Sequence, residues 1–149
     1  IAWWGQSAMD ISKDDTLWGA IKATAKEISA LNVIRGLPAI DLAYANSRIE
    51  TLARRGRDIA YVLAANTSGQ SQTWAFLVPL PEDQDSQAKS YQLADFHSGE
   101  ILGSGAIESG SRPIVTETMG LWNGVWRELL PPHGVRVYVI TSTAENGGE

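Results

Sequence analysis

The chain contains no cysteine among its 149 residues. This absence excludes disulfide bonds, thiolate zinc sites and cysteine nucleophiles, but it does not fix the compartment in which the protein works. Histidine is almost as scarce, since His97 and His133 are the only two and neither has another histidine or a cysteine within four residues. We therefore expect no metal ion and no organic cofactor, and we expect both histidines in exposed turns.

Positive charge is also in short supply. The formal net charge is −5 at pH 7, which argues against a nucleic-acid partner, because such a partner requires a basic face. The main basic cluster consists of Arg48, Arg54, Arg55 and Arg57. A cluster of this size is most often the solvated end of a helix; the alternative is that Arg54, Arg55 and Arg57 belong to an interaction surface.

Long apolar runs are missing as well. No segment approaches the roughly 18 apolar residues that a membrane span requires. Trp3 and Trp4, however, stand together before the first regular element. Either they pack onto the core of their own chain, or they contact a second subunit, another protein or a nearby membrane, because paired tryptophans are typical of such interfaces.

The composition is that of an ordinary globular protein, with 44% hydrophobic and 19% charged residues. The length predicts one domain over residues 1–149, with an irregular segment at 1–13 and a polar tail at 143–149. Three segments show helical spacing of apolar residues. The first starts at an acidic cap and continues through Leu17, Ile21, Thr24, Ile28 and Leu31; the second covers residues 42–52 and the third residues 116–130. Between the first two, residues 32–40 form a kink or a short strand around Pro38.

The remaining regular segments have the pattern of strands. Residues 59–65 and 73–80 predict a hairpin, and residues 91–96 and 101–102 predict a second hairpin with Ser98-Gly99 in its turn. Residues 135–140 form the last predicted strand. The sequence therefore predicts an α+β fold, with helices packed on one face of a mostly antiparallel sheet of four or five strands. We expect Trp74, Trp122 and Trp126 in its core.

Two short segments partly match known catalytic or phosphate-binding motifs, and each lacks an essential feature of its motif. Residues 5–9 lack the final glycine of the Gly-x-Ser-x-Gly nucleophile elbow, because Met9 replaces it. Residues 103–110 are rich in glycine like a phosphate-binding loop, but Ser111-Arg112-Pro113 follows in place of a helix. We therefore predict no catalytic and no cofactor-binding residue. Asn66-Thr67-Ser68 fits the N-glycosylation pattern, which matters only in a secreted eukaryotic protein.

Two segments together resemble a pattern found in bacterial envelope proteins. Residues 54–63 and residues 91–102 are similar to a helix, a strand and a hairpin of the form Leu-x-Asp-x-x-Thr-Gly-Glu-Ile-Leu. This order is similar to that of curli-secretion lipoproteins, of the outer-membrane lipoproteins that activate penicillin-binding proteins, and of the amino-terminal domain of TolB. The resemblance covers about a third of the chain. It implies helices on one face of a small sheet, a periplasmic or extracytoplasmic location, and binding or assembly in place of catalysis. The chain departs from the pattern at residues 82–90, which separate the strands, and in lacking a clear first strand.

Three functional hypotheses follow. The first is a non-enzymatic, exported envelope domain that binds another protein or a second copy of itself. The second is an extracytoplasmic sensor domain that binds a small ligand, for which a pocket lined by Tyr61, Trp74 and Arg112 would be evidence, whereas a flat apolar patch would favour the first. The third is an enzyme of an unrecognised family, whose site is assembled from scattered residues.

Overall fold

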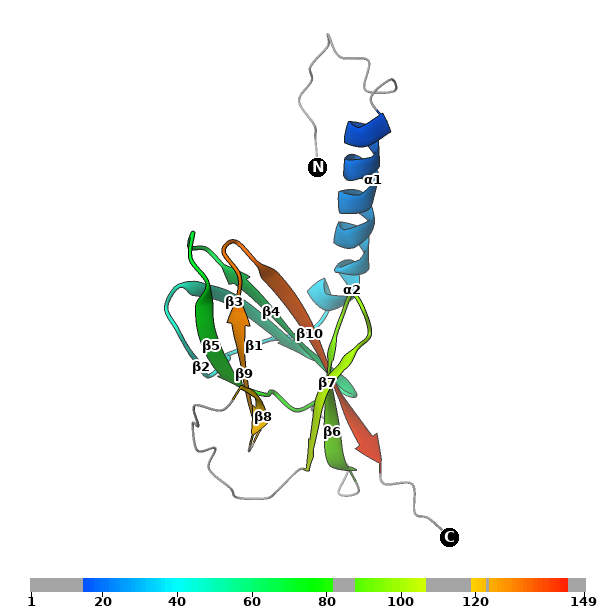
Figure 1. The fold of residues 1–149 in the computed structure, drawn as a ribbon. Coiled ribbons are helices and arrows are strands. Elements are labelled where there is room, and N and C mark those ends of the chain that lie inside the picture. The colour runs from blue at the N-terminus through cyan, green and yellow to red at the C-terminus, as the bar shows by residue number, and fades with distance from the viewer. Residues whose placement is uncertain (1–14, 82–87, 107–118, 123, 145–149) are drawn as a thin grey trace. The chain divides into compact units, whose positions relative to one another are not determined.

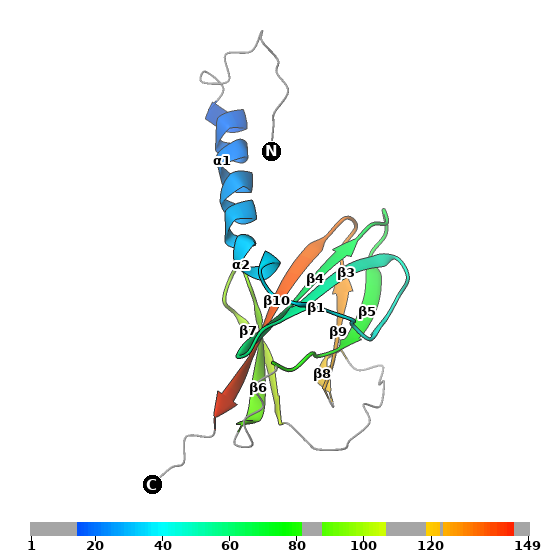
Figure 2. The same ribbon diagram turned by 180° about the vertical axis from the view of Figure 1, so that it is seen from behind.

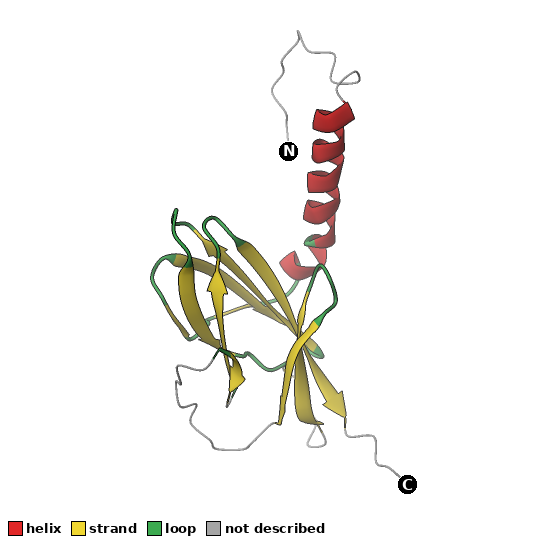
Figure 3. Cartoon of the chain, viewed as in Figure 1, coloured by secondary structure: helices red, strands yellow, loops and turns green. Residues whose placement is uncertain are grey.

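The computed structural model describes residues 15–81, 88–106, 119–122 and 124–144 (Figure 1). The chain forms two compact units, Ile1–Gly36 and Leu37–Glu149. The described elements of the first unit are two helices, α1 (Asp15–Ala30) and α2 (Asn32–Arg35). Those of the second unit are strands and the loops between them (Figure 3).

The first predicted helix is confirmed. It begins at Asp15, where a negative charge meets the positive end of the helix. The Leu31 amide still donates a helical hydrogen bond to the Glu27 carbonyl at 3.1 Å, so the helical turn continues one residue beyond α1. Within 32–40 the short strand is also confirmed, as β1 (Ala39–Ile40) after Pro38.

The strands of the second unit form two antiparallel sheets. The six-stranded sheet has the order β1, β3 (Ile49–Arg55), β4 (Ile59–Asn66), β10 (Val135–Ala144), β6 (Ala88–Asp95) and β7 (Ile101–Ala106). The four-stranded sheet has the order β2 (Tyr44–Ala45), β5 (Gln72–Leu77), β9 (Val125–Leu130) and β8 (Gly120–Trp122). The chain passes repeatedly from one sheet to the other, and the last strand, β10, lies between β4 and β6 in the middle of the larger sheet (Figures 1 and 2).

The hydrophobic core lies between the two sheets. Its centre is aromatic: the Trp74 ring stacks on Phe76 with centroids 4.7 Å apart, and the Tyr138 ring lies 5.1 Å from Phe76. The larger sheet contributes many small side chains to this core, including Ala53 and Ala60, which leave room for the rings. The architecture is therefore that of a β-sandwich, which buries one face of each sheet.

The predicted α+β fold class is wrong, because two of the three predicted helices are strands. Residues 42–52 contain β2 and the first half of β3. Their apolar residues happen to recur at spacings of three and four, but in the structure Ile49 and Ala53 are buried whereas Glu50 and Leu52 are exposed. This alternation is that of a strand, and seven residue pairs with β4 fix it.

The third predicted helix, residues 116–130, is the β8–β9 hairpin within the described part of that segment. Trp122 pairs with Val125 across the turn, and Gly124 has a φ of 75° that suits glycine. Trp126 is buried as predicted, whereas Trp122 lies on the outward face. The expectation that Trp122 belongs to the core is therefore wrong.

The predicted positions of the strands are confirmed, but one predicted pairing between strands is wrong. Residues 59–65, the hairpin of 91–96 with 101–102, and residues 135–140 are confirmed as β4, β6–β7 and the first part of β10. Residues 73–80 begin with β5, but β5 pairs with β2 and β9, whereas β4 pairs with β3 and β10. The predicted hairpin between β4 and β5 is wrong, because the chain changes sheets there. Strand β10 also extends to Ala144, into the predicted tail.

Candidate functional site

The three arginines of the predicted interaction surface lie around the end of a strand, and not at the end of a helix. Arg54 and Arg55 are neighbours in β3, so their side chains leave on opposite faces of the sheet. Arg54 Nη1 donates a hydrogen bond to the Leu37 carbonyl at 2.9 Å, and Arg57 is exposed in the turn after β3. The fold therefore gives the three guanidinium groups different surroundings.

Several sequence candidates lie outside the described residues: Trp3, Trp4, Met9 with its motif, Asp14 and Arg112. The predicted contact of Trp3 and Trp4 with a partner stays a prediction. The glycine-rich segment is described up to Ala106, and there it is strand β7. A Cβ atom added to Gly105 would lie 2.6 Å from the Tyr91 hydroxyl oxygen, so glycine at this position makes room for a core side chain.

A row of apolar side chains crosses the outward face of the four-stranded sheet. Leu77 of β5 pairs with Val125 of β9, which in turn pairs with Trp122 of β8. Their chain neighbours Phe76 and Trp126 face the core, so these three side chains face outward. Leu77 is 40% exposed and Trp122 is 51% exposed, whereas Val125 between them is buried. Leu77, Val125 and Trp122 are called the outer row below.

The same face continues beyond the outer row. The next row pairs Ala75 with Arg127 and Arg127 with Gly120, and the row after it pairs Thr73 with Leu129, which is largely exposed. Arg127 thus lies between two small residues, over which its long side chain can extend. The face thus combines a tryptophan, an arginine and exposed leucines.

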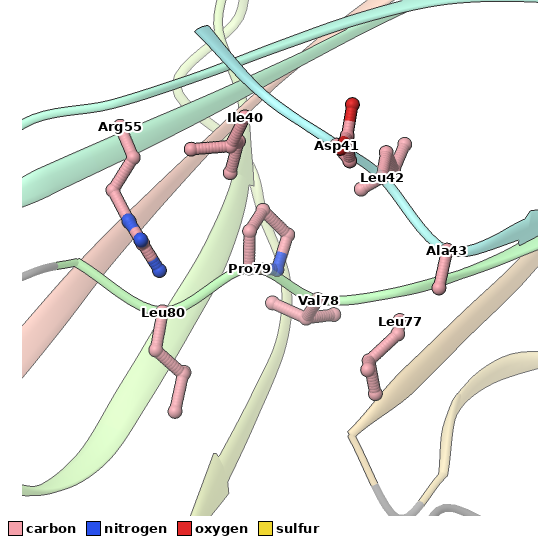
Figure 4. A pocket seen from close by; sticks show the side chains of 9 residues that line it. All are labelled: Ile40, Asp41, Leu42, Ala43, Arg55, Leu77, Val78, Pro79 and Leu80. Atoms are coloured by element: carbon pink, nitrogen blue, oxygen red, sulfur yellow. The ribbon is translucent and has the colours of Figure 1, made fainter. Parts of the chain in front are cut away.

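A hollow of about 530 Å³ adjoins the outer row (Figure 4). Residues 40–43 and 77–80 line it together with Arg55, and most of these side chains are apolar. The guanidinium of Arg55 extends toward Leu80, whereas the carboxylate of Asp41 points away from Pro79. Leu77 belongs both to the hollow and to the outer row, so the two form one continuous apolar region.

A polar network crosses from one sheet to the other near the core. The Arg136 guanidinium contacts the Asp95 carboxylate at 2.9 Å and the Glu128 carboxylate at 3.5 Å. The Tyr138 hydroxyl donates a hydrogen bond to Glu128. Asp95 also accepts hydrogen bonds from the His97 amide and from Ser98, which order the β6–β7 turn. Because β9 carries Glu128 and β10 carries Arg136, the network joins the two sheets.

The surroundings of this network shift the pKa of its members. Burial opposes ionisation of Asp95, but the hydrogen bonds from Ser98, His97 and Arg136 outweigh it and lower the pKa of Asp95. Burial raises the pKa of Tyr138 strongly, and the Glu128 carboxylate raises it further, so Tyr138 remains a neutral donor. Asp95 is thus favoured as an anion beside Arg136, and Tyr138 as a neutral donor, so the network is a structural link between the sheets.

Asn66 is a second buried polar residue with several hydrogen bonds. Its surroundings determine whether the N-glycosylation pattern at residues 66–68 is accessible. Its side-chain nitrogen donates to the carbonyls of Gln70, Leu130 and Pro131 at 2.7–3.3 Å, and its side-chain oxygen accepts from Ser68. The residue is 2% exposed. Asn66 therefore connects the β4–β5 loop to the β9–β10 turn, and in the folded chain its amide is closed to a glycosylating enzyme.

Both histidines lie in exposed turns, as predicted. His97 follows β6, and His133 adopts a φ of 54° in the turn between β9 and β10. Among the residues that the structure describes, no group of three or more histidine, cysteine, aspartate or glutamate side chains could hold a metal ion. None of the helices in the described ranges is long and apolar enough to cross a membrane.

Two members of the predicted sensor pocket lie far from a common cavity. Trp74 is in the core between the sheets, whereas Tyr61 is on the other face of the larger sheet, because its neighbour Val62 faces the core. The larger sheet therefore separates them.

The sequence does not predict the outer row, because the apolar spacing of residues 116–130 indicates a helix. The Asn-Gly pair at positions 123 and 124 is a strong sequence signal for a hairpin, and it favours the β8–β9 hairpin that carries Trp122 and Val125.

Comparisons with known proteins add little to this geometry. No protein-family model matches the chain, and no curated protein matches its sequence. Among solved structures, a GH30 endoxylanase from Clostridium papyrosolvens is similar with 18% sequence identity and a TM-score of 0.43. The match covers 78% of this chain and 26% of the endoxylanase, so the chain spans about a quarter of that protein. A likeness this distant supports no statement about function.

Proposed function

We propose that the second unit is a non-catalytic binding domain for another protein, and that the partner contacts the outer row and the hollow beside it. The observation that carries the proposal is the half-exposed Trp122 at the end of an apolar row that crosses three strands. Tryptophan in such a position exposes a large rigid apolar area, and tryptophan and arginine are the residues that most often dominate the free energy of protein association.

The chemistry of the surface defines the kind of partner. Trp122 and Leu77 would contact apolar side chains, and the hollow beyond Leu77 has room for an inserted aliphatic or aromatic group. The partner surface should therefore have an apolar centre.

The sensor hypothesis is the second candidate, and the observation in its favour is the volume of the hollow, which lies within the roughly 300–1,000 Å³ typical of ligand pockets. Tyr61 and Trp74 lie on opposite faces of the larger sheet, however, so they do not line one pocket, and the exposed side chains of the outer row support the binding of a protein. The α+β fold implied by the resemblance to envelope lipoproteins is contradicted, so an envelope location stays a hypothesis.

A site-specific photo-crosslinker placed at Leu129, on the same face as Trp122, tests the proposal in the cells that make the protein. Leu52 is the control position, because it is similarly exposed on the outward face of the other sheet. We expect one protein adduct from position 129 and none from position 52. With that partner purified, Trp122→Ala should weaken binding about thirtyfold, as expected for a hot spot of roughly 2 kcal/mol, whereas Leu52→Ala should leave it unchanged. Equal affinities of the two variants would refute the proposal.

A further inference from the structure

Helix α1 of the first unit has a stripe of apolar residues at helical spacing, and Ile28 is the member of it whose exposure is described along the helix. Every described side chain from Lys22 to Ala30 is exposed, including Ile28 at 40%. An isolated helix of this length is only marginally stable in water, because the free energy gained by adding a few turns barely offsets the free energy needed to form the first turn. Gly19 within the helix weakens it further, and a Cβ atom there would meet open space, so no close contact explains the glycine. A second helix that buries the stripe would therefore stabilise α1.

The spacing of the stripe identifies a helix as that partner. Positions 17, 21, 24, 28 and 31 are separated by four, three, four and three residues, which is the a/d repeat of a coiled coil. Ile21 and Ile28 then occupy the a positions, and Leu17, Thr24 and Leu31 occupy the d positions. The Leu31 amide bond to Glu27 keeps the last of these on the helical path. β-branched residues at a with leucine at d favour a parallel pair of helices over higher assemblies.

Charge on the flanks of the stripe is compatible with a second copy of the same helix. In a parallel pair, each g position faces the following e position of the other helix. These pairs are Ala20 with Ala25 and Glu27 with Asn32, so no like charges meet across the contact. The alanines also allow the two backbones to approach. We infer that α1 pairs in parallel with α1 of a second copy of this chain, through the stripe that contains Ile28.

This inference is independent of the proposed binding surface, because it concerns the first unit alone. The pair has only two heptads, so the dimer should be weak and its population should rise with protein concentration. Sedimentation equilibrium of the full chain over a wide concentration range measures this. We expect the average mass to rise toward that of a dimer, Ile28→Lys to remain monomeric, and Ser29→Lys, which adds the same charge beside the stripe, to behave like the wild-type chain.

The lack of cysteine in the chain provides a second measurement. Two a positions face each other directly in a parallel pair, at a separation that a disulfide can span. Ile28→Cys should therefore form a covalent dimer under mild oxidation, whereas Ser29→Cys should not. A wild-type chain that stays monomeric at every concentration, or two lysine variants with equal dimer populations, would overturn the inference, and so would equal crosslinking of the two cysteine variants. Circular dichroism of each variant checks that the β-sandwich remains folded.

Discussion

Replacing Trp126 and Trp122 one at a time by alanine is the sharpest test of the β8–β9 hairpin. On a helix the two residues would share one face, and both substitutions would damage the core. In the hairpin, Trp126 is 7% exposed with its ring 6.4 Å from that of Tyr138, whereas Trp122 is 51% exposed on the outward face. Trp126→Ala should therefore cost about 3–5 kcal/mol of unfolding free energy, the usual range for a large buried aromatic side chain. Trp122→Ala should cost about 1 kcal/mol or less, mainly through lost strand propensity.

Urea unfolding followed by far-ultraviolet circular dichroism provides the two free energies without using tryptophan fluorescence, which both substitutions change. The dependence of the free energy on urea should remain the same in all three proteins, so that the midpoints report stability directly. We expect the two costs to differ by at least about 2 kcal/mol. Costs equal within error would refute the alternation of inward and outward residues along β8 and β9, and with it the outer row.

Three further predictions concern the interior polar groups. Tyr138→Phe leaves the Glu128 carboxylate without its hydroxyl donor, and should lower the unfolding free energy by about 1.5–3 kcal/mol; a neutral effect in urea melts would contradict the hydrogen bond. Asp95 has a lowered pKa in the folded state, so its stabilisation is complete above its ordinary value of 3.8 and is lost as the pH falls through the lower folded value. Thermal melts at a series of acidic pH values should therefore show a steeper loss for the wild type than for Asp95→Asn, and parallel curves would show that Asp95 is not responsible. Asn66→Ala removes the donor to three carbonyls and should cost roughly 1–3 kcal/mol, with faster hydrogen exchange confined to the β4–β5 loop and the β9–β10 turn; unchanged exchange there would count against the link.

The sequence predicts the β6–β7 hairpin and the final strand well because local signals determine them. Gly99 has a φ of 71°, as the Ser-Gly turn requires, and the strand that precedes it alternates cleanly. The helix predictions for residues 42–52 and 116–130 are wrong because both segments contain strands whose apolar residues also recur at helical spacing. In the first segment the pairing of Ile49 with Asn66 resolves that ambiguity, and this contact is not local. In the second segment a local signal resolves it, the glycine turn between Trp122 and Val125.

The candidate site was harder to predict than the fold. Leu77 and Trp122 are 45 positions apart in the chain and become neighbours of Val125 only when β5, β9 and β8 pair. The polar network likewise depends on register, since Glu128 reaches Arg136 across two sheets. The helix α1 is the opposite case: its stripe is visible in the sequence because a helix places residues three and four apart on one face.

The central place of β10 has a consequence for the synthesis of the protein. Strand β10 pairs with β4 on one side and with β6 on the other, so it joins two groups of strands that are made before it. A ribosome that has not yet reached Val135 therefore carries two incomplete half-sheets, each with an unpaired edge that can pair with the wrong chain. The larger sheet can close only after residues 135–144 have left the ribosome. During that interval the edges of β4 and β6 are the segments of the nascent chain that most need the protection of a chaperone.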